Sequence, residues 1–153
     1  MIDFDNLEAY RETNRIEAKL ALGGLPESIW ETYSAFANTL GGIILLGVEE
    51  YPDRSLHPVD LPDPIDLMEE FWTKLNDPCY VGVNILTLDD VKVEDADGKS
   101  IIVIRVPMAK RKEKPVYIGR DPFSGSYYRS GDGDYRFTEE EVKAMIRDAE
   151  KEE

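Results

Sequence analysis

The sequence predicts a single α/β domain. Two observations indicate this class: apolar residues at helical spacing alternate along the chain with short apolar strands bounded by glycine, and no repeat or linker divides the chain. A length of 153 residues is enough to bury a hydrophobic core, and a hydrophobic content of 42% is typical of globular proteins. We therefore interpret residues 1–153 as one domain.

The first half of the chain predicts a strand, a helix and a second strand in succession. Residues 14–22 alternate apolar and charged side chains, as a half-buried strand does. Residues 29–40 have helical spacing, with Ser28 as a candidate N-cap and Gly41 as a left-handed stop. Residues 43–48 are apolar on both faces, which is typical of a central strand. A short helix or turn over 3–12, a loop over 51–64 and a helix over 65–76 complete this half.

The second half predicts further strands and a final helix. The strands are expected over residues 91–94, 100–106, 115–119 and 126–130, the last two around a Pro-Phe-Ser-Gly turn. Asp97-Gly98 lies between two alternating segments and predicts a hairpin. Thr138, followed three residues later by Glu141, is a capping box that opens a helix over 139–151.

The charge of the chain limits its possible partners. A formal net charge of −14 argues against nonspecific coating of nucleic acid, which depends on cation contacts with phosphate. Residues 105–136 are the exception, because they hold eight Lys and Arg against four Asp and Glu. No apolar run reaches the ~18 residues of a membrane span, and no secretory signal is visible. The single cysteine, Cys79, forms no internal disulfide and is expected to be a buried small hydrophobe, so we expect a cytoplasmic protein with no membrane partner.

Four segments carry a family resemblance. "RETNRIEAK", "AFANTLGGIILLGVEE", "KPVYI" and "SYYRSGDG", in this order and spacing, resemble the Schlafen AlbA-like domain from about residue 11 to residue 149. The resemblance implies an α/β (α+β) fold with a mixed, mostly antiparallel sheet flanked by helices. It also implies a nucleic-acid-binding domain of the kind found in bacterial transcriptional-regulator-like and helicase-like proteins.

The "AFAN-x-x-GG-x-x-x-x-GV" block is the most specific part of the resemblance. We interpret Gly41, Gly42 and Gly47 as structural positions. The paired Gly41-Gly42, with Ala35 and Ala37, lets the helix end pack close to the sheet because small residues allow backbone approach. Asn38 falls in the last turn of the helix, where its amide could hydrogen-bond a neighbouring loop. Pure architecture and a functional role are both consistent with Asn38.

A set of carboxylates is the first candidate site. In some animal Schlafen proteins the domain is a metal-dependent ribonuclease, and the resemblance assigns its acidic residues to Glu12, Glu17 and Glu50, with Lys19 as the accompanying lysine. Three carboxylates could hold Mg²⁺ or Mn²⁺, which would activate water and neutralise phosphodiester charge. Glu50 stands where the family usually has aspartate, and Glu49 is an alternative third ligand.

A basic segment is the second candidate site. Its residues combine cations, which bind phosphate, with aromatic rings, which stack on unpaired bases. The predicted nucleic-acid-binding residues are Lys110, Arg111, Lys112, Lys114, Arg120, Tyr128 and Arg129. The simpler alternative is a solvated turn at 110–114 followed by a strand whose tyrosines belong to the core.

Three functions are therefore consistent with the sequence. The first, which we favour, is a regulatory DNA- or RNA-binding domain without enzymatic activity. The second is a divalent-metal ribonuclease that uses the three carboxylates. The third is a protein-interaction or homodimerisation domain whose acidic surface suits a basic partner.

Overall fold

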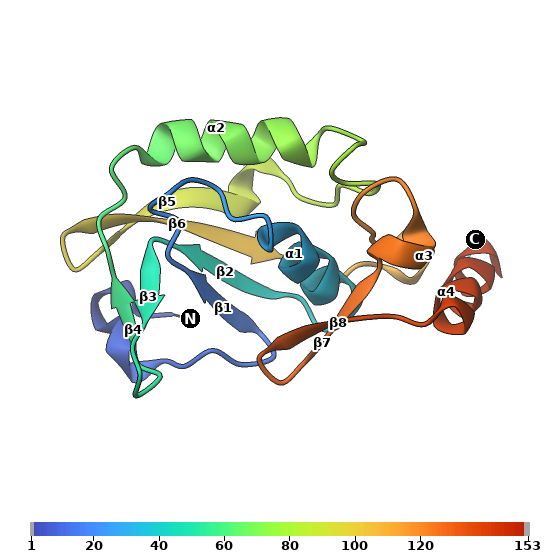
Figure 1. Ribbon diagram of the computed structural model, residues 1–153, viewed down its shortest axis with the longest axis horizontal. Coiled ribbons are helices and arrows are strands. Elements are labelled where there is room, and N and C mark those ends of the chain that lie inside the picture. The colour runs from blue at the N-terminus through green and yellow to red at the C-terminus, as the bar shows by residue number, and fades with distance from the viewer. Residues whose placement is uncertain (1, 152–153) are drawn as a thin grey trace.

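The computed structural model describes residues 2–151 (Figure 1). Its elements are η1 (Phe4–Ala9, a 3₁₀ helix), β1 (Ile16–Lys19), α1 (Ile29–Asn38), β2 (Gly42–Leu46), β3 (Val48–Glu50), β4 (Leu56–Pro58), α2 (Pro64–Leu75), η2 (Leu88–Asp90), β5 (Val91–Ala96), β6 (Lys99–Val106), η3 (Arg111–Glu113), α3 (Pro122–Gly125), β7 (Tyr127–Ser130), β8 (Gly133–Arg136) and α4 (Glu139–Lys151). No helix in this part of the chain combines the length and the apolar character needed to cross a membrane.

The main sheet has four strands in the order β1-β2-β6-β5. β1 and β2 are parallel and are connected through α1, whereas β2–β6 and β6–β5 are antiparallel. The predicted mixed, mostly antiparallel sheet is therefore confirmed. The predicted hairpin is confirmed too, since Asp97 and Gly98 both have the positive φ angles of a tight turn between β5 and β6.

Each face of this sheet carries its own hydrophobic core. Ile44 and Leu46 of β2 and Ile102 and Ile104 of β6 pack with α1 and α2. Leu45, Ile101 and Val103 face the other way and pack with η1, β3 and β4. Figure 1 shows α2 running along β5 and β6, while the β7–β8 hairpin lies beside α1. This alternation follows from the period of two along a strand, which makes successive side chains point to opposite faces.

Gly41 and Gly42 of the "AFAN" block act as predicted, and Gly47 does not. Gly41 has φ +75°, and its N–H donates to the Phe36 carbonyl at 2.7 Å, which ends α1. A Cβ on Gly42 would lie 2.8 Å from the Phe36 ring, so this position requires glycine for close packing. Gly47 has φ +87° and turns the chain away from the sheet. The strand predicted over 43–48 is therefore wrong as one element: it ends at Leu46, and β3 begins at Val48 in a second sheet with β4.

Several local predictions need correction. The loop predicted over 51–64 contains β4, which pairs with β3. Residues 122–125 form the short helix α3, and β7 pairs with β8 instead of with residues 115–119, which make only isolated bridges. Ser28 makes no side-chain capping bond, because its backbone is already helical (φ −65°, ψ −10°), and its hydroxyl accepts from Lys19 Nζ at 3.0 Å.

The predicted start of α4 is confirmed, whereas the predicted burial of Cys79 is wrong. The capping box is confirmed: the Thr138 N–H donates to Glu141 Oε1 at 2.9 Å, and the Glu141 N–H donates to Thr138 Oγ1 at 3.2 Å. Cys79 was expected in the core and is instead exposed, in the turn that follows α2.

Candidate functional site

Two of the three predicted acidic residues, Glu12 and Glu17, are in contact at the edge of the main sheet. Glu12 precedes β1, and its Oε2 accepts the Ala18 N–H at 2.9 Å, which bends the carboxylate back over the strand. The pKa of Glu12 is raised from 4.5 to about 7, mainly by burial. The Ala18 N–H lowers this pKa, whereas the hydrogen-bonded Glu17 carboxylate and the charge of Glu50 raise it. The Glu12 and Glu17 carboxylates are therefore in contact, whereas Glu50 acts on Glu12 through its charge alone.

The third carboxylate belongs to Glu50. It lies at the end of β3, which pairs antiparallel with β4, and its side chain is exposed. Glu49 precedes it in the same strand, so its side chain points to the opposite side. Of the two candidates for a third ligand, Glu50 is the one whose charge raises the pKa of Glu12.

Glu17 is held by two cations. Its Oε1 lies 2.9 Å from Arg129 Nη2, and its Oε2 lies 3.6 Å from Lys19 Nζ. The Glu17 side chain is 14% exposed and the Lys19 side chain 11% exposed, so these ion pairs are largely shielded from water. Glu17 and Lys19 share one face of β1, as their spacing of two residues predicts.

Arg129 is the centre of a buried network. Its side chain is 0% exposed, its Nη1 lies 2.8 Å from Asp134 Oδ1, and its Nη2 donates to the Thr13 carbonyl at 2.8 Å. The guanidinium also lies over the Phe36 ring, 4.8 Å from the ring centre. Arg129 was predicted to contact nucleic acid, but in this conformation its donors are used within the protein.

Asp134 is the residue that sequence reasoning missed. It faces Arg129 across the β7–β8 hairpin, and its Oδ2 accepts from Thr32 Oγ1 of α1 at 2.7 Å. The signal was present in "RSGDGD", because a two-residue Gly-Asp turn would place residues 129 and 134 opposite each other.

A divalent ion does not fit this arrangement. Both Glu17 oxygens already have a cationic partner, and Glu12 Oε2 accepts a backbone N–H. Within residues 2–151, no group of three or more His, Cys, Asp or Glu side chains has the geometry to hold a metal ion. In this geometry Glu12 instead holds a proton up to near-neutral pH beside the Glu17 carboxylate.

Asn38 ties two distant segments to α1. Its side-chain amide donates to the carbonyls of Val116 and Tyr127 at 2.9 and 3.0 Å, and its Oδ1 accepts the Val116 N–H at 2.8 Å. The side chain is buried, so these bonds satisfy backbone groups that water does not reach. The predicted hydrogen bond from Asn38 to a neighbouring loop is present, and Asn38 has an architectural role.

The basic loop 110–114 lies on the surface beside α4. Lys110 and Lys112 extend from it, and neither has a carboxylate partner at ion-pair distance among the described residues. Arg111 pairs with Asp148 of α4, its Nε lying 2.7 Å from Oδ2. Lys114 is half-buried at the end of η3. The loop therefore presents two lysine charges to solvent and uses Arg111 to dock α4.

The other two predicted contact residues, Arg120 and Tyr128, differ in their exposure to solvent. Arg120 is exposed, and its Nη2 donates to Cys79 Sγ at 2.8 Å. Tyr128 is half-buried, with its ring 5.0 Å from the Phe137 ring and 5.8 Å from the Tyr135 ring. Tyr135, at 51% exposure, is the more accessible ring of this aromatic group.

Comparison with known proteins agrees with the fold and the motifs. The sequence profile of the family Schlafen, AlbA_2 matches residues 12–138. The structure is similar to the solution structure of the N-terminal domain of a protein from Nitrosomonas europaea that is related to the ATP-dependent DNA helicase RecG. That similarity has a TM-score of 0.63 and 32% sequence identity, over 88% of this chain and 90% of the other.

A second solved structure shares the fold alone. It is the DIP2311 protein from Corynebacterium diphtheriae, with a TM-score of 0.50 and 19% identity over 88% of this chain and 24% of that chain. Among curated proteins, none matches the chain.

Proposed function

Because this chain belongs to the Schlafen AlbA_2 family, we propose that it is a nucleic-acid-binding domain with a regulatory role. One observation carries the proposal: the family match spans residues 12–138, which include every element from β1 to β8. The similar domain from Nitrosomonas europaea belongs to a protein related to a DNA helicase, which supports a role on nucleic acid.

The charge distribution supports a localised contact. Phosphate binding depends on cations that release counterions from the nucleic acid, and most of this strongly acidic surface would repel it. Lys110 and Lys112 extend from a surface loop without ion-pair partners among the described residues, and Arg120 adds a third exposed cation. We assign phosphate contact to these three side chains and leave Arg129 out of the assignment, since it is buried.

The proposal is tested by fluorescence anisotropy with labelled single- and double-stranded DNA and RNA at 50 and 200 mM salt. K110Q/K112Q should weaken binding. The slope of log affinity against log salt concentration should become shallower by about 0.7 to 0.9 for each phosphate contact that is lost. K143Q/R147Q, which removes two charges from α4, is the matched control and should bind like wild type. Absence of binding at 50 mM salt would contradict the proposal.

A metal-dependent ribonuclease is the second candidate, favoured by one observation: the charge of Glu50 acts on Glu12, the hydrogen-bond neighbour of Glu17, although Glu50 is distant from both in sequence. Glu17 would have to exchange Arg129 and Lys19 for a metal ion before the cluster could act. RNA cleavage in MnCl₂ that disappears in Glu17→Gln and in the exposed Glu50→Gln would support it. Cleavage that survives both changes would exclude this site.

A further inference from the structure

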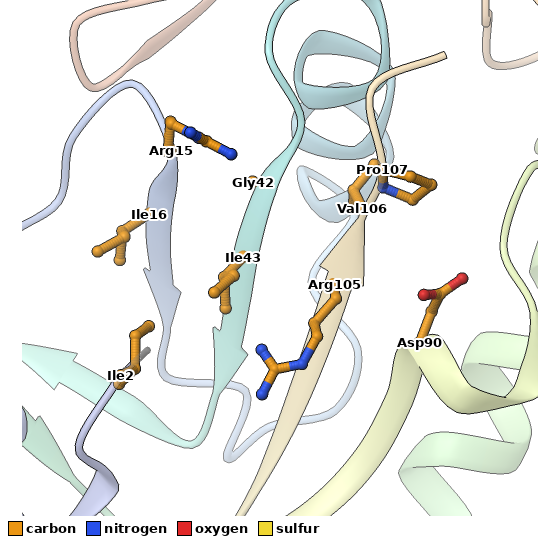
Figure 2. A pocket seen from close by; sticks show the side chains of 9 residues that line it. All are labelled: Ile2, Arg15, Ile16, Gly42, Ile43, Asp90, Arg105, Val106 and Pro107. Carbon is orange, nitrogen blue, oxygen red and sulfur yellow. The ribbon is translucent and has the colours of Figure 1, made fainter. Parts of the chain in front are cut away.

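An open groove crosses the main sheet on the face opposite α1 and α2 (Figure 2). Its volume is about 390 Å³. Figure 2 shows Ile16 and Ile43 on its floor, with Arg15 near one end and Arg105 at the side. Apart from the backbone of Gly42, none of the predicted site residues lines this groove.

Strand register explains why these side chains meet. Ile16 of β1 is opposite Ile43 of β2, and Ile43 is opposite Arg105 of β6, so the three form a row across the sheet. Farther along the same face, Leu45 and Val103 are covered by η1 and by β3 and β4. The row itself is only half-buried. With strands ~4.8 Å apart, it is ~10 Å wide between its outer Cα atoms.

The cations of the groove are not neutralised from within the protein. Among residues 2–151, no carboxylate lies at ion-pair distance from Arg15 or Arg105. Asp90 lines the groove, but its Oδ2 accepts from the Thr87 N–H and hydroxyl at 2.8 and 3.2 Å. In Figure 2 its carboxylate points away from Arg105.

A further lysine extends this charge along the open face. Lys92 of β5 is opposite Val103, so it lies on the same side of the sheet as Arg105, and it is exposed. Glu94, two residues farther on, is opposite Ile101 and lies toward the covered part of the face. In a chain of net charge −14, two arginines that line an apolar floor, with Lys92 farther along the same face, form a local concentration of positive charge.

We propose that this groove binds the sugar–phosphate backbone of single-stranded nucleic acid. Guanidinium groups bind phosphate oxygens in a bidentate manner, and Arg15 and Arg105 would hold phosphates at the rim of the floor. Ile16 and Ile43 offer apolar contact to sugars and to the faces of unpaired bases, which a duplex keeps stacked inside. The inference rests on the proposed nucleic-acid function and gives it a second contact surface besides loop 110–114.

The test is anisotropy with a fluorescein-labelled 12-nucleotide RNA and the DNA of the same sequence, using the full chain. R15Q/R105Q should weaken binding about tenfold or more, which corresponds to about 1.4 kcal/mol or more, and should lower the salt slope by about 1.4, or about 0.7 for each lost phosphate contact. Ile43→Glu, which places a carboxylate in the floor, should weaken binding as well. Circular dichroism checks that each variant is folded.

The outcomes separate this inference from the proposed function. One outcome is that K110Q/K112Q binds more weakly than wild type while R15Q/R105Q binds like wild type. In that case the assignment of the groove is wrong and the proposed function stands. If R15Q/R105Q weakens binding no more than the control K143Q/R147Q, the effect is diffuse charge and the groove is again wrong. If wild type binds the duplex form of the same sequence more tightly than either single strand, the single-strand assignment is overturned. If wild type binds no nucleic acid, the proposed function fails together with the groove.

Discussion

Replacement of Glu12 by glutamine should make the protein more stable at pH 8 and leave it unchanged at acid pH. Glu12 keeps its proton up to about pH 7 in the folded state, whereas a glutamate in the unfolded chain loses it near pH 4.5. Between these values the unfolded state binds fewer protons, so the free energy of unfolding falls as the pH rises. A glutamine side chain at this position has no proton to lose and can still accept the Ala18 N–H.

The magnitude follows from the pKa of Glu12. A rise from 4.5 to about 7 corresponds to at most ~3 kcal/mol, at 1.36 kcal/mol per pH unit. Glu12 is half-buried, so solvent screening reduces this to about 1–2 kcal/mol. Glu12→Gln should therefore exceed wild type by about 1–2 kcal/mol at pH 8, and the difference should vanish near pH 4.5.

Urea denaturation followed by tryptophan fluorescence between pH 4.5 and 8 measures this difference. Glu49→Gln is the control. It removes an exposed carboxylate of β3, which lacks the contacts that Glu12 makes. A stability gain in Glu12→Gln that is the same at every pH would refute the reasoning. So would a pH-dependent gain of equal size in Glu49→Gln.

Three further variants test the architecture by chemical denaturation. Asn38→Ala leaves the Val116 N–H without its partner in the core and should lower the free energy of unfolding by about 2–4 kcal/mol; a loss below about 1 kcal/mol would contradict the role of this amide. Arg129→Met leaves the largely shielded Asp134 carboxylate without its cation and Glu17 with Lys19 alone, and should lower the free energy of unfolding by about 3–5 kcal/mol. Unchanged stability with weakened RNA binding would restore Arg129 as a contact residue. Gly42→Ala forces a Cβ against the Phe36 ring and should lower the free energy of unfolding by about 1–3 kcal/mol. Gly98→Ala is the comparison: its Cβ would meet no atom, but its φ is positive, so any loss there comes from backbone strain and not from packing.

Local signals in the sequence were read correctly where neighbours along the chain decide the structure. The capping box of Thr138 and Glu141, the hairpin turn at Asp97-Gly98 and the stop at Gly41 all depend on residues a few positions apart. The strand predicted over 43–48 failed at Gly47, because the positive φ there turns the chain into a second sheet, and apolar composition on its own does not reveal a change of sheet.

The sequence by itself determined the α/β class, the family motifs and the residue types of the acidic and basic segments. The tertiary structure decided what those residues do, because burial and charge pairing depend on contacts between distant segments. Arg129 reaches the Thr13 carbonyl across 116 residues and is therefore buried instead of facing solvent. Arg105 is brought beside Ile16 and Ile43 by register across three strands, and Arg15, just before β1, reaches the same groove, which no local pattern indicates.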